Sequence, residues 1–228
     1  MRLHRGGVRH HSAVSRHLLL GWLFWLLISV TVNLSIDSPL STWTSASLRP
    51  AVRGLSQSII IGLVVIWPVW RLSQRRSEFP GYQTATDVFL LLLTAQIPLL
   101  GMMAWAGWPM RHMLLIDLIV VVYTAAAGVA VWLGWRGRGT GGTGRVCSAA
   151  ACAMLLFGGW MGVLVGGASG AAMWSPNYML WRLTDPLSEL PVEQVIWRLA
   201  VLGAATLAVW LAGLGTGGGS RKAVVSGL

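Results

Sequence analysis

Apolar residues occur along the chain in six long stretches that are separated by short polar segments. Each stretch is about 20 residues long, which suits an α-helix that crosses a hydrocarbon layer about 30 Å thick. The stretches cover residues 17–36, 55–71, 87–107, 113–134, 146–166 and 194–213. The pattern predicts an all-α membrane protein with six transmembrane helices in one domain, 17–213, between a basic arm, 1–16, and a tail, 214–228. The second stretch contains Pro68 near its end, so we expect it to be tilted or partly unwound.

The composition and charge agree with this class of protein. Of the 228 residues, 55% are hydrophobic and 11% are charged, whereas soluble domains carry about 25% charged residues. The formal net charge is +10, but the basic residues stand in short clusters between apolar stretches, where they set membrane topology. The expected partner is therefore the lipid bilayer, and no nucleic-acid partner is expected.

Basic residues are divided unequally between the two predicted sides. Twelve of the seventeen lie on the side that holds both chain ends. The five on the other side or at its helix ends are Arg49, Arg53, Arg111, Arg182 and Arg198. Because basic segments stay on the cytoplasmic side, both termini are predicted to be cytoplasmic. Since almost all basic residues are arginine, with abundant glycine and alanine, we expect a multi-pass protein of a bacterial inner membrane.

Tryptophans form pairs three residues apart near the ends of four predicted helices. The pairs are Trp22 and Trp25, Trp67 and Trp70, Trp105 and Trp108, and Trp132 and Trp135. This spacing places both indoles on one helix face, and tryptophan is enriched at membrane interfaces. The pattern predicts a belt of tryptophans at headgroup depth.

The stretch from Gly167 to Gly170, Gly-Ala-Ser-Gly, resembles the nucleophile site of rhomboid-type intramembrane proteases. A nucleophilic serine needs a general base, which in that family is a histidine on a later helix. No histidine follows Ser169, and His112 lies at the start of the fourth predicted helix. We therefore expect no catalytic residue and no enzymatic activity. The glycines of 146–166 and the following loop instead predict a thin helix face on which a neighbouring helix or a second copy can pack.

No cofactor or metal site is predicted. Cys147 and Cys152 are the two cysteines, and a zinc site requires three or four Cys or His ligands. The segment Gly137 to Gly142 matches G-x-G-x-x-G, but it lies between two predicted membrane helices and not between a strand and a helix. It is interpreted as a connector.

Asp117 lies within the fourth predicted helix, about one and a half turns from its outward end. A carboxylate at this depth normally faces protein or water and has a partner. Arg198 is predicted at a similar depth in the sixth helix, and a pair between them would neutralise both; Arg111, Arg182 and Asp185 are alternative partners. Three interpretations remain open, namely a structural clamp, a substrate or proton site, and a side chain that snorkels to the interface.

Two uncharged polar residues also lie within predicted helices. Gln96 is midway along the third helix, and Asn33 is in the first. Polar residues at such positions usually form hydrogen bonds between helices. We expect both to do so, and the alternative is that they line a path through the membrane.

Two connecting segments are candidate interaction surfaces. The segment Arg71 to Asp87 combines basic residues with an acidic residue and a Pro-Gly turn, and it is either a docking loop or a simple topological anchor. Its candidate docking residues are Arg71, Arg75, Arg76 and Glu78. The outward segment 167–193 predicts a short helix or a re-entrant piece at the interface. Its singled-out residues are Trp174, Trp181, Arg182 and Asp185.

Six helices with both ends inside, a short cytoplasmic arm and a long last outward loop resemble the permease subunits of type-2 ABC exporters. The resemblance implies that a cytoplasmic element after the second helix, here Arg71 to Asp87, couples to an ATPase. It also implies that re-entrant pieces before the last helix, here Ala168 to Glu193, form the outer gate. Because this chain has no nucleotide-binding motif, the ATPase would be a separate chain.

The leading functional hypothesis is therefore a non-catalytic, transport-associated membrane subunit, either a permease or an accessory partner of an exporter. The second hypothesis is a scaffold or assembly subunit of another membrane complex, which would hold its partners through the glycine-rich face. The third is an intramembrane enzyme, which ranks below the others because the chain lacks paired catalytic groups.

Overall fold

The computed structural model is all-α over the part of the chain that it describes. That part comprises residues 16–37, 44–74, 80–136, 142–166, 172, 174–184 and 192–216. Its elements are α1 (Arg16–Asp37), α2 (Ser45–Ile61), a π-helical turn η1 (Gly62–Ile66), α3 (Trp67–Ser73), α4 (Pro80–Trp105), α5 (Met110–Arg136), α6 (Thr143–Gly166), α8 (Pro176–Thr184) and α9 (Val192–Thr216). The arm 1–15 and the tail 217–228 lie outside the described residues.

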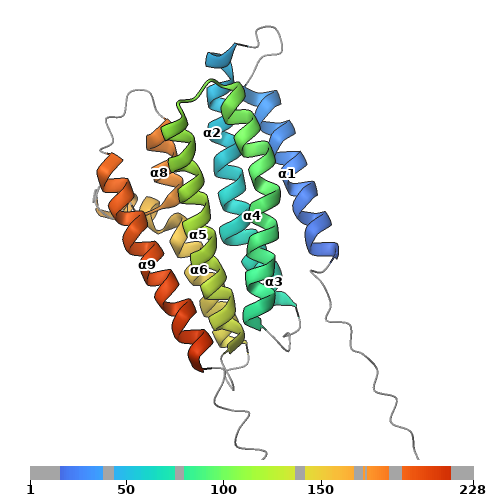
Figure 1. Ribbon diagram of the computed structural model, residues 1–228, viewed down its shortest axis with the longest axis vertical. Helices are drawn as coiled ribbons and strands as arrows, with labels where there is room; N and C mark the ends of the chain where they lie inside the picture. The colour runs from blue at the N-terminus through green and yellow to red at the C-terminus, as the bar shows by residue number, and fades with distance from the viewer. Residues whose placement is uncertain are drawn as a thin grey trace, which may run out of the picture.

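Long apolar helices lie side by side in a bundle (Figure 1). Within the described residues, five segments are long and apolar enough to cross a membrane. They are Arg16–Ser35, Ser47–Ser73, Pro80–Trp105, Met110–Arg136 and Val192–Ala212, and α6 adds a shorter apolar helix, Thr143–Gly158. The predicted class, a multi-pass helical membrane protein, is thus confirmed, whereas a sixth full span stays a prediction.

Both ends of the described bundle lie at the same end of the molecule. In Figure 1, α1 begins and α9 ends at the lower end of each helix. We call this the basic end, because Arg136 and Arg145 also lie there, and we call the other the opposite end. The long helices α1, α2, α4, α5, α6 and α9 alternate in direction, so α9 runs in the same direction as α5.

The second membrane helix differs from its predicted form in two ways. It begins at Ser45, ten residues before the predicted start, because Thr44 and Ser47 form a reciprocal capping box and the polar residues that follow are helical. It is also continuous through Pro68, and the predicted unwinding is replaced by the π-helical turn η1. The N–H of Trp67 bonds to the carbonyl of Gly62, which widens the turn directly before the proline that lacks an N–H.

The predicted tryptophan belt is wrong for the first helix. Trp22 is 5% exposed, and its indole N–H donates to Thr94 Oγ1 at 2.9 Å on α4. Trp25 donates to the carbonyl of Ser58 at 3.1 Å on α2. Both rings lie against Gly62, where an added Cβ would come within 2.6 Å of each. These indoles therefore hold α1 against its neighbours, because the indole N–H of a buried tryptophan needs a partner inside the bundle.

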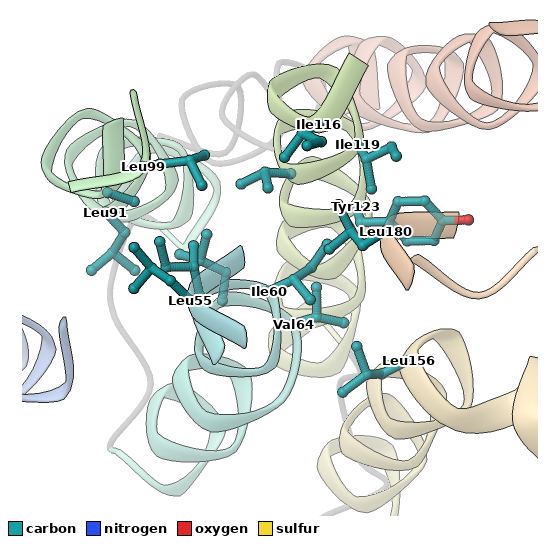
Figure 2. Close-up of a cluster of buried hydrophobic side chains, with 14 of the residues drawn as sticks. Leu55, Ile60, Val64, Leu91, Leu99, Ile116, Ile119, Tyr123, Leu156 and Leu180 are labelled. Carbon is teal, nitrogen blue, oxygen red and sulfur yellow. The ribbon is translucent and has the colours of Figure 1, made fainter. Parts of the chain in front are cut away.

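A single hydrophobic cluster connects most of the helices (Figure 2). Leu55 of α2, Leu91 of α4 and Tyr123 of α5 belong to it, as do Leu156 of α6 and Leu180 of α8. Membrane helices associate through close packing and not through exclusion from water, so small residues matter where they cross. The short helix α8 is thus part of the core and not a surface element.

The crossing of α5 with α6 depends on Gly134. A Cβ at this position would lie 2.6 Å from Ser148 Oγ, 2.9 Å from Ser148 Cβ and 3.0 Å from Leu72 Cδ2. We expect Gly134→Ala to lower the free energy of unfolding by about 1–3 kcal/mol, because the helices must separate. The matched control is Gly101→Ala, where nothing lies within 4 Å, and the greater helix propensity of alanine should stabilise the helix by up to about 1 kcal/mol. Unfolding in mixed micelles, followed by circular dichroism, measures both, and equal effects would contradict the close crossing.

Candidate functional site

The chain re-enters the bundle after α6. The hydroxyl of Tyr123 donates to the carbonyl of Trp174, and the hydroxyl of Ser175 donates to the carbonyl of Leu156 at 2.6 Å. Tyr123 is the middle residue of α5, and Leu156 is within two residues of the middle of α6. The segment that precedes α8 therefore lies near the middle of the bundle and not at its end.

From this point α8 leads back toward the opposite end. Its last residue, Thr184, accepts a hydrogen bond through its carbonyl from Arg53 Nη2 at 2.7 Å, and Arg53 lies near the start of α2. Met179 and Leu180 on α8 are buried in the core. The predicted short helix is present, but it lies inside the bundle against α2, α5 and α6, and the expected position at the interface is wrong.

The residues singled out in this segment have different surroundings. Trp174 is 45% exposed, and the guanidinium of Arg198 lies 5.8 Å from its ring centroid. Trp181 is half-buried and its ring is 6.2 Å from that of Tyr178. Arg182 is half-buried on α8, and Asp185 lies outside the described residues.

Asp117 is bonded to Gln96 and not to Arg198. The amide Nε2 of Gln96 donates to Asp117 Oδ1, so the predicted inter-helix bond of Gln96 is present, between α4 and α5. Among the described residues no ion pair joins Asp117 to Arg198. The partner predicted from matched depth is therefore wrong.

The matched depth itself is present in the structure. A Cβ on Gly203 of α9 would lie 3.9 Å from Val122 of α5, and the two helices run in the same direction. Asp117 and Arg198 each lie five residues before this contact on their own helix, so they are at the same depth. Successive residues of an α-helix are rotated by about 100° around its axis, so the five residues from Asp117 to Val122 place their side chains about 140° apart. The carboxylate therefore faces α4, while Arg198 faces the re-entrant segment.

Asn33 forms the predicted link between helices. Its Nδ2 donates to the carbonyl of Ser29 at 2.7 Å within α1 and approaches Ser58 Oγ on α2 at 3.4 Å. Ser58 also accepts the indole bond of Trp25 through its carbonyl. Asn33 thus contributes to the contact of α1 with α2.

Near the basic end, a buried ion pair joins Arg71 to Asp87. Arg71 Nε lies 2.7 Å from Asp87 Oδ2, and the two side chains are 3% and 0% exposed. The guanidinium also bonds through Nη1 to Gln74 and lies 5.1 Å from the ring centroid of Trp135. Arg71 is therefore a buried structural residue, and its predicted place on a docking surface is wrong.

Asp87 was not predicted as a functional residue. Its signal in the sequence is that Arg71 and Asp87 stand at facing ends of two consecutive apolar stretches, as an antiparallel pair of helices would place partners. The other predicted docking residues, Arg75, Arg76 and Glu78, lie outside the described residues. The ion pair joins α3 to α4, the two helices on either side of the segment that contains them.

Other candidate chemistry has little described structure. Ser169 and the glycines from Gly167 to Gly170 lie outside the described residues, and of the predicted glycine face of α6 only Gly158 has described surroundings, with nothing within 4 Å of an added Cβ. Cys147 is exposed and Cys152 is buried, both as free thiols. Within the described ranges, no three His, Cys, Asp or Glu side chains are grouped in a way that could hold a metal ion.

Comparisons with known proteins give no match. No family model, no curated protein and no solved structure corresponds to this chain.

The buried ion pair generates a test by double-mutant cycle. Asp87→Leu leaves the Arg71 guanidinium buried without its counter-charge, and we expect a loss of about 3–5 kcal/mol in the free energy of unfolding. Arg71→Met combined with Asp87→Leu removes both charges, so the double variant should be more stable than Asp87→Leu alone. Equilibrium unfolding in mixed micelles measures both, and purely additive losses would show that the two side chains do not interact.

Proposed function

We propose that the protein is a non-catalytic, transport-associated subunit of a bacterial inner membrane, a permease or accessory partner of an exporter. Both termini are cytoplasmic, so the basic end faces the cytoplasm and the opposite end faces outward. The protein works with a separate ATP-hydrolysing chain that docks at the segment after the second membrane helix.

The observation that carries this proposal is the re-entrant segment of Trp174 to Thr184. A non-spanning piece of chain at membrane depth is stable only where protein or a water-filled cavity surrounds it, and in transporters such pieces lie at the pathway. Here the bonds from Tyr123 and Arg53 hold its two ends at different depths. This arrangement supports an outer gate at the place where the resemblance to type-2 ABC exporter permeases implies one.

The buried ion pair supports docking at the basic end. Arg71 and Asp87 lie on either side of the segment 75–79 and join α3 to α4. Because breaking a buried ion pair is costly, α3 and α4 would move together when a partner displaces that segment. Its basic side chains, Arg75 and Arg76, suit an acidic docking surface on the ATPase.

Co-purification tests the proposal. The tagged full chain, extracted from its own host in a mild detergent, should carry a stoichiometric ATP-hydrolysing subunit that mass spectrometry identifies and an ATPase assay confirms. Arg75→Glu with Arg76→Glu should reduce recovery of that subunit at least tenfold through charge repulsion. The control is Arg136→Glu with Arg138→Glu, which makes the same charge change in the other basic segment and should retain the subunit.

Two outcomes would contradict the proposal. One is recovery of an unrelated membrane complex with no ATP-hydrolysing chain, which would favour the scaffold hypothesis. The other is equal loss of the ATPase in both double variants. That result would show that binding depends on the overall positive charge and not on the segment after the second helix.

A further inference from the structure

A groove opens on the surface of the bundle where α1 diverges from α4 toward the basic end (Figure 1). Its walls include Leu18, Trp22 and Trp25 of α1, Trp67 and Trp70 of α3, and Leu91 of α4. The ring of Trp70 crosses α1 at Gly21, where an added Cβ would lie 2.6 Å from Cη2 of the indole. Trp70 is 38% exposed, and Gly21 and Trp25 are partly exposed, so this tryptophan groove is open to the outside of the bundle.

The tryptophan groove lies in the half of the membrane nearer the basic end. Trp25 bonds to the carbonyl of Ser58, which is within two residues of the middle of the second membrane helix, so Trp25 is near the middle of the span. Arg16 begins α1 nine residues earlier, about 14 Å toward the basic end. Because half of a hydrocarbon layer is about 15 Å thick, the groove lies within the layer and Arg16 lies near its surface.

The walls of the groove suit a hydrocarbon chain. The indole N–H groups of Trp22 and Trp25 donate to Thr94 and to the carbonyl of Ser58, so these rings present carbon atoms to the groove. Its open space is about 260 Å³, below the roughly 300–1,000 Å³ of pockets for drug-sized ligands. A single narrow chain therefore fits this space better than a bulky molecule does.

The end of the groove near the membrane surface carries basic side chains. His17 precedes Gly21 by one turn of α1 and lies on the same face, and Arg16 is next to it; both are exposed. Helical side chains lean toward the start of their helix, which here is the basic end, and a long basic side chain reaches the headgroups. Among the described residues at this end, the acidic side chain is Asp87, which is 0% exposed and paired with Arg71. A headgroup with a net negative charge thus finds a cation, whereas an ammonium group finds no exposed carboxylate in the described part.

We propose that the tryptophan groove is a binding site for an anionic phospholipid of the leaflet at the basic end. One acyl chain lies between α1 and α3 and reaches Trp25, and the phosphate of the headgroup lies against Arg16 and His17. Basic side chains next to a gap between membrane helices are a common way to hold an anionic lipid. The inference does not depend on an ATPase partner or on which end of the bundle faces the cytoplasm.

Photolabelling with two lipid probes tests the site in the unsubstituted protein. The purified full chain in phosphatidylcholine nanodiscs receives a trace of phosphatidylglycerol or of phosphatidylcholine, each with a diazirine midway along one acyl chain. Peptide mass spectrometry compares labelling between Leu18 and Trp25 with labelling at Leu211, which is 59% exposed near the basic end of α9 and reports ordinary lipid contact. This ratio should be about fivefold higher for phosphatidylglycerol, which is the contribution of one basic residue near an anionic headgroup.

A pair of charge variants tests the headgroup contact. Arg16→Glu should abolish the preference for phosphatidylglycerol, whereas Arg136→Glu makes the same charge change at an exposed position of α5 at the basic end and should retain it. If Arg16→Glu fails to fold, the comparison of the two probes on the unsubstituted protein still decides. Equal ratios for the two probes overturn the proposal, as does an equal effect of both variants. Absence of label from the groove with either probe also overturns it, because something other than an acyl chain, such as a second copy of the chain, would then cover the groove.

Discussion

A polar group inside a hydrocarbon layer is stable only where another part of the protein bonds to it, and this constraint determines how the helices of the bundle meet. The indoles of Trp22 and Trp25 bond to α4 and α2, and Arg71 of α3 bonds to Asp87 of α4. Gln96 bonds to Asp117 across α4 and α5. The apolar surfaces supply close packing, and the polar contacts select which faces come together.

The same constraint accounts for the re-entrant segment. Backbone that leaves a helix at membrane depth needs partners from neighbouring helices, and here the carbonyls of Trp174 and Thr184 receive them from Tyr123 and Arg53. Arg53 thereby places a cation of the second membrane helix on the last carbonyl of α8, where the helix dipole favours positive charge. A short helix held in this way joins the middle of the bundle to the opposite end, where the proposed transport role requires a gate.

Hydropathy predicts the class of the protein because a span of apolar residues must match the thickness of the bilayer. It also predicts depth, since counting residues from the helix ends places Asp117 level with Arg198, as the contact of α5 with α9 requires. Hydropathy does not predict which neighbouring helix a side chain faces, because the rotation of a helix about its axis depends on packing against neighbours that the sequence does not identify. For that reason the partner of Asp117, the burial of Arg71 and the core position of α8 emerge only from the structure.

The depth of the segment before α8 is the most direct test of this account. Nitroxide labels on single cysteines, in a variant whose native cysteines are replaced, report depth through collisions with oxygen and with a water-soluble relaxation agent. Exposed positions of α4 provide the scale, with Leu93 near the middle of the helix and Trp105 at its end. The account predicts that a label at Trp174 reads close to Leu93 and that a label at Trp181 reads closer to Trp105. A label at Trp174 that reads at the depth of Trp105 would contradict it.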